Sequence, residues 1–584
     1  MFKRWGGRVP WVAISAGVIA FFYLRRLLSL IPGPDGLLGV DWMLFLPWLL
    51  DGRYGVEAGG LFNVQWFTPS FCGGIPKFPD PQDQFFSVPQ FFTFFMPPIE
   101  SARLTVVIFA LAGFLGFYGL MRKRFGFGPS ASLAGAAVFL CNGYYSGGMV
   151  AGHLAKHPFM LLPLIAYFLF GAAWGKGRFS RDAVSQIAGA AVCIAYAIWA
   201  GAVVSVPVML FAVVGLGFFA ALTDPEKRLA QFFLAFAVSV VFAIALSAAK
   251  LSASAYFAQN FSRDFYPLPG VSSVGDLATL LFHSLFGSPS VASDIPMEGR
   301  KFDLEPYEFD YGVTFVPLAV FILSSFWLKG RDGEAGSKRI NWAAIAGLLL
   351  MAVTPFALNY YSPGWNHLLK MTPIIKSSST NIRWFALYIP LISAFTAAVL
   401  DRISAKGAGW ETSGVVCALA VLLATLGAGR REEQIRLYNP ALTTAAFKQP
   451  APPIQRIELS ETGIGKNDLL VHGASSMRCY SSMFGYRLEK MPFKTLHEGP
   501  ALEAADGVLN VKNPACYVYP KENGCAPGDH FLASETDNAS LFLARKPYDF
   551  STPWRQRAAD WFTLVAWFFW VWAVVKIPKN SIKN

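Results

Sequence analysis

Acidic residues suited to general-base chemistry lie in a polar stretch rich in proline and glycine, residues 32–98. Asp41 stands between Val40 and Trp42, soon after a long apolar run. A carboxylate that loses water at the edge of a membrane becomes a stronger base and could remove a proton from a hydroxyl. Asp41 could instead cap a short amphipathic helix, MLFLPWLL, lying on the membrane. On this carboxylate alone the structural interpretation is favoured by roughly two to one, because structural carboxylates are common.

A second polar group lies in the segment FPDPQDQF, residues 78–85, which contains Asp80, Gln82 and Asp83. Two carboxylates this close could hold a divalent ion such as Mg²⁺ or Mn²⁺, or accept hydrogen bonds from a sugar. The prolines also favour a tight turn in which the aspartates accept from neighbouring backbone N–H groups. The segment alone does not separate these two interpretations.

Two histidines, His153 and His157, lie in the short segment GHLAKHP. Neutral imidazoles could bind a sugar hydroxyl or a metal ion. Their spacing could place them on one face of a helix, although Pro158 favours a short loop. A role in a site and a role in packing at the membrane interface are about equally supported.

The elements that must position these residues are membrane helices. Of the 584 residues, 54% are hydrophobic and 15% are charged, and the mean hydropathy is +0.41. Soluble proteins carry about 25% charged residues, so most of this chain is solvated by lipid. About twelve apolar runs are close to the length that a spanning helix needs, and we predict spans at 9–30, 103–120, 130–149, 159–174, 183–200, 202–222, 229–248, 313–328, 340–358, 384–400, 414–427 and 558–575.

The net charge of +12 reflects topology rather than binding to nucleic acid. Lysine and arginine recur in alternate connections between the apolar runs, which is the pattern of the positive-inside rule. The pattern predicts a multi-pass protein of the bacterial inner membrane with both termini in the cytoplasm. The basic residues that define it include Arg122 to Arg124, Lys176, Arg178, Arg181, Lys227, Arg228, Lys329, Arg331, Arg402, Lys406, Lys576 and Lys579.

This topology divides the chain into a transmembrane part, residues 1–429, with external stretches at 32–98 and 250–311. A polar region, residues 430–554, follows outside the membrane, and residues 555–584 form a last helix and a tail. The polar region alternates apolar and polar residues, so we predict a small α/β domain. Cys516 and Cys525 flank a turn-rich segment and could form a hairpin disulfide, or Cys479 could be one partner.

The first external stretch contains an ordered set of aromatic, proline, glycine and acidic residues: Trp66, Pro69, Gly73, Gly74, Pro76, Asp80, Pro81, Gln82 and Pro89. The set continues beyond the next span to the Gly152-His153 pair and the Leu162-Pro163-Leu164 run. In this order the residues resemble the first periplasmic loop and following helices of the YfhO-like branch of the GT-C glycosyltransferase superfamily. The resemblance covers roughly the first 400 residues.

The resemblance implies a GT-C-like membrane fold and a role for each candidate residue. An acidic residue of this loop is the catalytic base in such enzymes, which places Asp41 in that role and makes Asp80 and Asp83 supporting residues or metal ligands. The donor is a polyprenyl-phosphate sugar. Lys376 and Arg383, in the segment IIKSSSTNIRWF, could hold its phosphate, although they could also anchor the next helix at the interface.

The resemblance therefore predicts an inverting transferase that moves the sugar to a glycan, glycolipid or protein of the envelope. No cofactor is certain, and a divalent metal is an option. The sequence has no Walker A, Rossmann or GxSxG motif, so nucleotide hydrolysis, dinucleotide cofactors and serine hydrolysis are unsupported. Three other functions remain open: a flippase or transporter of lipid-linked sugars, a non-catalytic envelope assembly factor, and a polymerase or ligase of surface polysaccharide.

Overall fold

The computed structural model describes most of the chain in full atomic detail. The described residues are 9–175, 181–224, 227–262, 266–301, 304–327, 341–373, 375–405, 412–428, 436–459, 467–477, 479, 481–485 and 488–575. Both chain ends and several basic residues that define the predicted topology, Lys176, Arg178, Lys329, Arg331 and Lys406 among them, lie outside this set.

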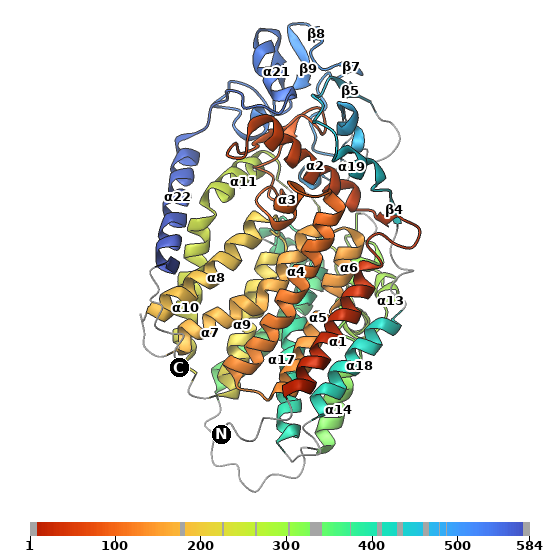
Figure 1. Cartoon of the computed structure of the whole chain (residues 1–584), viewed down its shortest axis with the longest axis vertical. Coiled ribbons are helices and arrows are strands. Elements are labelled where there is room, and N and C mark those ends of the chain that lie inside the picture. Colours follow the sequence, from red (N-terminus) through yellow and green to blue (C-terminus); the bar gives the residue numbers. More distant parts are fainter. Residues whose placement is uncertain are drawn as a thin grey trace.

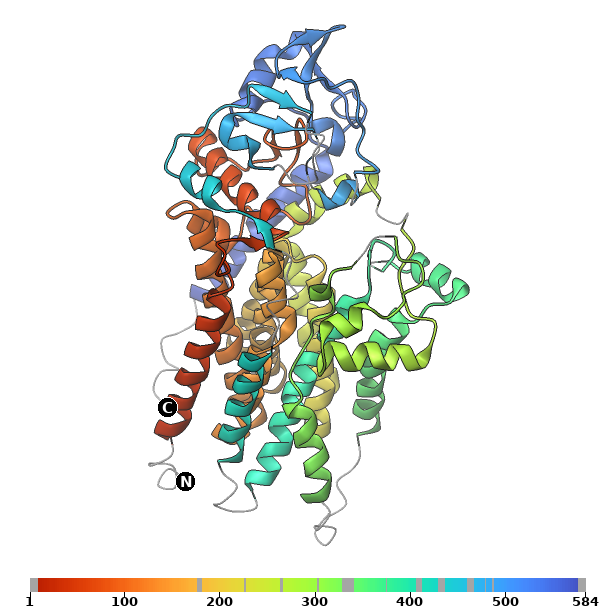
Figure 2. The same ribbon diagram turned by 90° about the vertical axis from the view of Figure 1, so that its right-hand side faces the viewer.

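The molecule is a bundle of long helices that carries a small domain at one end (Figures 1 and 2). Among the described residues, eight helices are long and apolar enough to cross a membrane, which confirms a helical, multi-pass membrane protein. By length and composition these spans are Trp11–Leu28, Pro98–Phe125, Leu154–Trp174, Asp182–Trp199, Ser205–Thr223, Leu229–Leu246, Trp342–Asn359 and Ile382–Ser404.

Most spans consist of a single α-helix, and three begin or end in a differently wound segment. The helices are α1 (Val9–Leu28), α4 (Pro98–Gly119) with η2 (Leu120–Phe125), η3 (Leu154–Leu161) with α7 (Leu162–Trp174), α8 (Arg181–Trp199), α9 (Ser205–Thr223), α10 (Leu229–Leu246), α15 (Trp342–Asn359), and η5 (Ile382–Leu387) with α17 (Tyr388–Ser404).

The other predicted spans correspond to shorter or less apolar helices. These are α14 (Val316–Trp327), α18 (Ser413–Gly427) and α22 (Trp554–Val575). The span predicted at 130–149 is divided into α5 (Pro129–Leu140) and α6 (Gly143–Ala151). The division falls at Asn142, whose side chain accepts from the backbone N–H of Tyr145 at 2.8 Å and caps α6.

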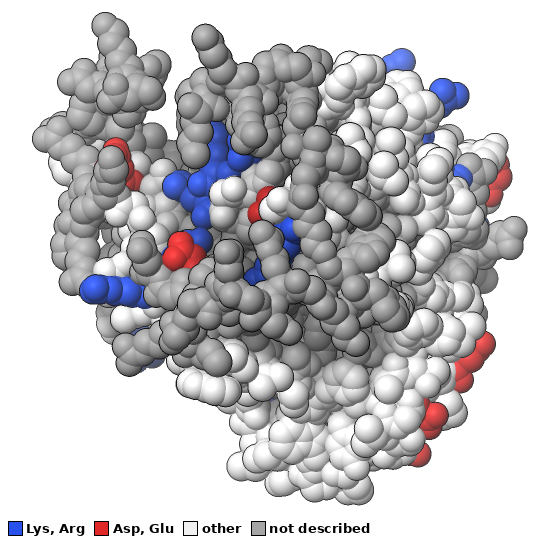
Figure 3. Space-filling view, turned by 90° about the horizontal axis from the view of Figure 1, so that it is seen from below, with Lys and Arg blue, Asp and Glu red and all other residues white. Residues whose placement is uncertain are grey.

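Basic residues gather at the end of the bundle opposite the small domain. Arg122, Lys123 and Arg124 end the long α4–η2 helix there. The Lys227 ammonium donates to the carbonyl of Arg124 at 3.3 Å, which brings the connection before α10 to the same place. Seen from below, lysine and arginine side chains cluster on this end (Figure 3). Several of the basic residues on which the predicted topology rests therefore lie together at this end of the bundle.

The C-terminal domain comprises the described residues between 436 and 553 and contains two small sheets, as expected for a mixed α/β unit. One sheet has the order β6-β5-β7, with β5 parallel to β6, and the other has the antiparallel order β10-β9-β8. Its elements are β4 (Arg436–Tyr438), α19 (Ala441–Ala446), β5 (Arg456–Glu458), η7 (Asn467–His472), β6 (Ala474–Ser476), η8 (Ser482–Phe484), β7 (Gly499–Pro500), β8 (Ala504–Ala505), β9 (Val508–Lys512), α20 (Ala515–Val518), β10 (His530–Leu532), η9 (Ala533–Glu535) and α21 (Thr536–Leu543).

The first external stretch packs into this domain rather than standing apart as a loop. Strand β1 pairs with β4, the backbone of Phe71 bridges to Ser476, and the N–H of Gly73 donates to the Ser475 hydroxyl at 3.0 Å. The stretch contains β1 (Leu38–Gly39), α2 (Trp42–Gly59), β2 (Phe67–Thr68), β3 (Ile75–Pro76) and α3 (Val88–Thr93).

The second external stretch forms short helices near the same end of the bundle. Helix α11 packs against α22, and the backbone N–H of Ala249 donates to the Thr563 hydroxyl at 2.8 Å. Its elements are α11 (Ala248–Asn260), α12 (Val274–Leu285), α13 (Pro289–Ser293) and η4 (Pro306–Phe309), and α16 (Pro363–Met371) follows later between two spans.

Two disulfides lie at this end of the molecule. Cys516 pairs with Cys525, which is the hairpin pairing that the sequence left as one option. Cys479 pairs with Cys72 of the first external stretch, a partner 407 positions away. Cys141, Cys193 and Cys417 take part in no disulfide and lie in the helical bundle. Disulfides persist in oxidising compartments, so both pairs fit a domain that faces away from the cytoplasm.

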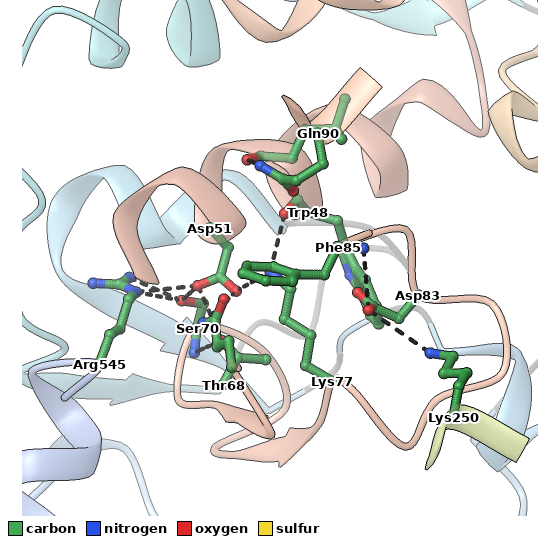
Figure 4. Close-up of polar contacts among 12 residues, drawn as sticks. Trp48, Asp51, Thr68, Ser70, Lys77, Asp83, Phe85, Gln90, Lys250 and Arg545 are labelled. Atoms are coloured by element: carbon green, nitrogen blue, oxygen red, sulfur yellow. Dashed lines mark hydrogen bonds and ion pairs between the residues drawn. The ribbon is translucent and has the colours of Figure 1, made fainter. Parts of the chain in front are cut away.

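The buried carboxylate of Asp51, on α2, joins the first external stretch to the C-terminal domain (Figure 4). The Lys77 ammonium lies 2.6 Å from it, and the Arg545 guanidinium lies 3.1 Å from it; all three side chains are almost fully buried. Burial raises the pKa of Asp51, but the two cations and nearby hydroxyls outweigh this and lower it to about 2. The remaining donors to the carboxylate are the side chains of Gln65, Thr68 and Ser70.

Alkylation of the unfolded protein tests the two disulfides. We expect N-ethylmaleimide in denaturant to modify three thiols per chain without reductant and all seven after reduction. Replacing Cys72→Ser should expose one further thiol before reduction, because Cys479 loses its partner. Intact-protein mass spectrometry measures the number of modified thiols in both proteins. Seven adducts on the unreduced protein would contradict the pairing.

Replacing Asp51→Asn should destabilise the external part of the molecule strongly. The change leaves Lys77 and Arg545 buried without a counter-ion, and breaking such a cluster costs about 3–5 kcal/mol. Because the folded-state pKa lies below the usual value of about 3.9, the ionised carboxylate stabilises the fold above that pH. This contribution is lost as the pH falls toward 2. Thermal unfolding in detergent, measured at several pH values, checks both effects.

Glu57→Gln on the same helix is the matched control. The Glu57 carboxylate pairs with Arg53 at 2.6 Å, but its side chain is 35% exposed. Such i,i+4 pairs contribute only about 0.3–0.5 kcal/mol. Equal losses of stability in the two variants would show that burial of the Asp51 cluster has no special importance.

Candidate functional site

Asp41 lies at the start of α2, at the level where the bundle meets the C-terminal domain. It occupies the N-cap position, but its side chain makes no capping hydrogen bond, so the carboxylate is available for other contacts. Its backbone N–H donates to the carbonyl of Ala151 at 3.1 Å, and the indole of Trp42 donates to the carbonyl of Val150 at 3.3 Å. The start of α2 is therefore fixed against the end of α6.

Two glycines make this close approach possible. Gly152 ends α6 with φ +109°, and a Cβ there would collide with the backbone of Asp41 and Trp42. A Cβ on Gly39 would likewise meet the carbonyls of Val150 and Ala151. Gly152 therefore allows the next residue, His153, to lie beside Asp41.

His153 and Asp41 are in direct contact. The imidazole Nε2 lies within hydrogen-bonding distance of Asp41 Oδ2, and the two side chains are 15% and 19% exposed. The same Nε2 lies 3.8 Å from Oε1 of Glu308, on η4 of the second external stretch. The ring edge of Tyr307 packs against the imidazole, with 5.1 Å between ring centroids.

Glu308 joins this pair to Arg383, at the start of the α17 span. Arg383 donates from Nη2 to Oε1 at 2.7 Å and from Nε to Oε2 at 3.2 Å, which is a forked, bidentate pair. The glutamate side chain is 7% exposed and that of Arg383 is 18% exposed. Arg383, a residue singled out in the sequence, therefore lies in the same cluster as Asp41 and His153.

Lys156 completes the cluster from η3. It is buried, its aliphatic stem runs beside Gly148 of α6, and its ammonium lies 4.9 Å from the ring centre of Tyr144. Burial raises the pKa of Glu308, but the charges of Arg383, Lys156 and His153 outweigh it and hold that pKa well below its usual range. The cluster is thus a set of cationic groups around an ionised carboxylate, with Asp41 at its edge.

The segment with Asp80, Gln82 and Asp83 forms a turn instead of joining the cluster. Asp80 Oδ1 accepts from the backbone N–H of Gln82 at 2.8 Å, and Asp83 Oδ2 accepts from that of Phe85 at 3.2 Å. The Lys250 ammonium donates to the carbonyls of Phe78 and Asp80, and it lies 3.8 Å from Asp83 Oδ2 (Figure 4).

This arrangement is the proline-set turn that the sequence offered as the alternative to a metal site. Both aspartates are buried and use their oxygens within the turn. Over the described residues, no group of three or more His, Cys, Asp or Glu side chains is arranged to hold a metal ion. At this turn the two aspartates accept from backbone N–H groups, and the Lys250 ammonium lies beside Asp83.

His157 is also separate from the cluster. Its Nδ1 is 2.7 Å from the carbonyl of Leu154, and its Nε2 is 2.7 Å from the hydroxyl of Tyr196 on α8. The ring is fully buried, with Phe109 at 4.4 Å between centroids. Both nitrogens are used inside the bundle, so His157 packs helices together while His153 faces the site.

Lys376 lies on the turn that follows α16, with its side chain exposed. Its carbonyl accepts from the Lys370 ammonium at 2.8 Å. No contact joins its ammonium to Arg383 within the part of the chain that the structure describes. Of the two cations expected to act together, only Arg383 reaches the buried cluster.

Two members of the cluster, Glu308 and Lys156, received no role in the site from the sequence. Glu308 belongs to an acidic run that is typical of a solvated loop, and no feature of the surrounding sequence distinguishes it from the other acidic residues there. Lys156 stands between the two histidines in GHLAKHP, so a signal was present. A lysine flanked by apolar residues next to a membrane span needs an ionic partner, and that requirement could have selected it.

Comparison with known proteins gives only remote structural likenesses. No family model and no curated protein sequence matches the chain. The cryo-EM structure of the arabinofuranosyltransferase AftD from mycobacteria aligns with 71% of this chain, at 15% identity and a TM-score of 0.41. The crystal structure of ArnT from Cupriavidus metallidurans bound to undecaprenyl phosphate aligns with 76% of it, at 16% identity and a TM-score of 0.39.

These alignments also differ in the share of the other protein that they include. The chain spans about a quarter of AftD, 26% of its length, and 70% of ArnT. At these values the likenesses identify neither a family nor a reaction, and the function proposed below is argued from the cluster and the sequence motifs.

The two histidines should respond differently to substitution. His157→Ala removes one of the two partners of the buried Tyr196 hydroxyl, which then only accepts from the backbone N–H of Val88, and should cost about 1–3 kcal/mol of stability. His153→Ala removes a side chain at the edge of the cluster and should leave thermal unfolding nearly unchanged. If the cluster is catalytic, His153→Ala should lower turnover by about 10–100-fold. Melting curves and donor consumption of the two variants separate the roles, and the reverse pattern would contradict the assignment.

Proposed function

We propose that this protein is a membrane glycosyltransferase of the GT-C type that takes a sugar from a polyprenyl-phosphate donor. The observation that carries the proposal is the convergence of Asp41, His153 and Arg383 at one end of the bundle. These residues come from three distant parts of the chain, and each was selected from its chemistry or from the motif resemblance. A purely structural role for Asp41 would not require these three side chains to lie together.

Asp41 acts as the general base in this proposal. Its side chain makes no capping hydrogen bond to α2, and the imidazole of His153 contacts the carboxylate and can hold it in place. In the reaction Asp41 accepts the proton of the acceptor hydroxyl. The hydroxyl oxygen bonds to the anomeric carbon as the bond from that carbon to the phosphate oxygen breaks. The configuration inverts, and the lipid phosphate leaves with both bonding electrons.

Arg383 and Lys156 receive the phosphate of the donor. Arg383 already holds two carboxylate oxygens in a forked pair, and a phosphate presents oxygens in the same geometry. Lys156 adds a buried positive charge next to it. Cations of this kind stabilise a leaving phosphate, so no separate acid is needed. Lys376 is an exposed cation at the same end of the α17 span, and in this proposal it makes the first contact with the donor.

The site faces away from the cytoplasm. Basic residues gather at the opposite end of the bundle, and both disulfides lie on the same side as the site. The membrane is the bacterial inner membrane in this proposal, and the acceptor is a glycan, lipid or protein of the envelope. The C-terminal domain, which encloses the first external stretch, lies above the site and is placed to contact the acceptor.

Donor consumption tests the proposal directly. The purified protein, reconstituted in phosphatidylcholine nanodiscs, is incubated with a panel of polyprenyl-phosphate sugars, and loss of each donor is followed by mass spectrometry. We expect at least one donor to be consumed, and Asp41→Asn to reduce the rate by about 10²–10⁴-fold, the usual contribution of a general base.

Asp35→Asn serves as the matched control, because Asp35 lies in the same stretch and its side chain is 48% exposed. It should retain the unaltered rate. Consumption that persists in Asp41→Asn would refute the base assignment. No consumption of any donor would favour a flippase of lipid-linked sugars or an assembly factor.

A further inference from the structure

Helix α12, in the second external stretch, is apolar but too short to cross a membrane. It has 12 residues, Val274–Leu285. At 1.5 Å per residue it is about 18 Å long, whereas the hydrocarbon core of a bilayer is about 30 Å thick. An apolar helix of this length is either buried inside the protein or lies along a membrane surface. The positions of its ends and its exposed side chains distinguish these two cases.

Both ends of α12 are fixed at the outer ends of bundle helices. Before α12, the backbone N–H of Val271 donates to the carbonyl of Asn359, the last residue of α15, at 2.8 Å. After α12 begins to end, the carbonyl of Leu285 accepts from the N–H of Val313 at 2.8 Å, three residues before α14 starts at Val316. Helix α12 therefore bridges the outer ends of α15 and α14, and it runs across the direction of the bundle helices (Figure 2).

The end of α15 marks the outer edge of the apolar layer. Helix α15 is a candidate span of 18 residues. It is about 27 Å long, close to the thickness of the hydrocarbon core. Its side chains Leu349, Leu350 and Val353 are exposed, and around a span this exposure is to lipid. Val274 follows Val271 by three residues, which is at most about 10 Å of chain. Helix α12 therefore starts at the depth where acyl chains meet headgroups.

Around its axis α12 has one buried face and two exposed faces, one apolar and one polar. The buried face carries Leu277, Leu280 and Ser284, the apolar face carries Val274, Ala278 and Phe282, and the polar face carries Asp276 and Thr279. Residues four apart form one stripe along a helix. Val274 is 71% exposed and Phe282 is 48% exposed. A helix lying in a membrane surface requires this division, because one exposed side contacts acyl chains and the other contacts water.

Neighbouring segments extend the apolar surface at the same depth. Helix α16 begins four residues after α15 ends, and the Trp365 indole donates to the carbonyl of Ala357 in the last turn of α15 at 2.7 Å. Leu368 and Met371 on α16 are 51% and 67% exposed. Phe315, just before α14, is 62% exposed. Exposed apolar side chains therefore lie at both of the helix ends that α12 bridges.

We infer that α12 lies in the outer headgroup layer of the membrane, with Val274, Ala278 and Phe282 inserted among the acyl chains. The occupant of this face is lipid, because the face starts at the outer end of α15 and continues the lipid-facing surface of that span. The inference goes beyond the proposed function and does not depend on it.

This position also sets the depth of the cationic cluster. The Asn381 amide donates to the carbonyl of Leu358 at 3.0 Å, and the Asn359 amide donates to the carbonyl of Asn381 at 3.0 Å. The turn before Arg383 is thus held at the end of α15. Arg383 then lies at the depth of lipid phosphate groups, and in the proposed reaction the donor phosphate reaches it without leaving that layer.

Fluorescence quenching tests the inference without any substrate. Phe282→Cys is introduced into the full chain with Cys141, Cys193 and Cys417 replaced by alanine, labelled with bimane, and reconstituted in phosphatidylcholine nanodiscs. In a second preparation the phosphatidylcholine carries bromine on its acyl chains near the headgroup. We expect the brominated lipid to lower the emission about twofold, because the apolar face of an interfacial helix is buried about 5–10 Å into this boundary. Iodide in the water should leave the emission nearly unchanged.

Thr279→Cys is the matched control, on the polar face of the same helix and three residues away. Bimane at this position should be quenched by iodide and not by bromine. Phe493→Cys replaces a 50% exposed apolar residue of the C-terminal domain and should behave in the same way. Equal bromine quenching at positions 279 and 282, or none at 282, would overturn the inference. Protection of position 282 from both quenchers would also overturn it, since a protein partner or a second copy of this chain would then cover the face.

Val274→Cys gives an independent measurement on the apolar face and should match Phe282→Cys. Melting curves identify any labelled variant that has unfolded, and Val274→Cys then replaces Phe282→Cys. None of these measurements uses a donor sugar. A protein that consumes no donor would therefore contradict the proposed function and leave the quenching result intact, whereas bromine-insensitive labels at positions 274 and 282 would contradict only the membrane contact of α12.

Discussion

The buried carboxylate of Asp51 is the interaction on which the external half of the molecule depends. It receives hydrogen bonds or ion pairs from the first external stretch and from Arg545, which lies 494 positions away at the end of the C-terminal domain. Burial of one anion with two cations is tolerated only when all three groups are present, because a buried charge without its partner costs far more free energy. The cluster therefore fixes the middle of α2 relative to the C-terminal domain and limits where the start of that helix can lie.

The start of α2 carries Asp41, about 15 Å from Asp51 along the helix at 1.5 Å per residue. It is fixed independently, by the Trp42 indole on the carbonyl of Val150 and by the close approach that Gly152 permits. Held at its start and again in its middle, α2 leaves its N-terminal carboxylate little freedom. Such positioning on a supported element is what a catalytic group needs, since a misplacement of about 1 Å can cost two orders of magnitude in rate.

Much of the membrane topology was readable from the sequence, because hydropathy and the placement of basic residues are local properties. Asp41, His153 and Arg383 were also singled out, through residue chemistry and the motif resemblance together, and the structure brings them into one cluster. The contact between Glu308 and Arg383 and the Cys72–Cys479 disulfide could not be predicted from the sequence. Both join segments that only the complete fold brings together. The single span predicted at 130–149 failed for a local reason, the helix cap formed by Asn142.

In the proposed reaction, the charges of the cluster allow a carboxylate base and a phosphate leaving group to lie close together. Arg383 and Lys156 would repel each other in a buried site, and the ionised Glu308 between them offsets that repulsion. In the proposed reaction the donor phosphate is a diester with a single negative charge, and it leaves as a monoester with about two near neutral pH. Over the same step Asp41 takes up a proton and loses its own charge. The negative charge that appears on the phosphate, beside Arg383 and Lys156, is thus matched by the charge that disappears at Asp41. The total charge of the site is unchanged, and little reorganisation of the surrounding dipoles is required.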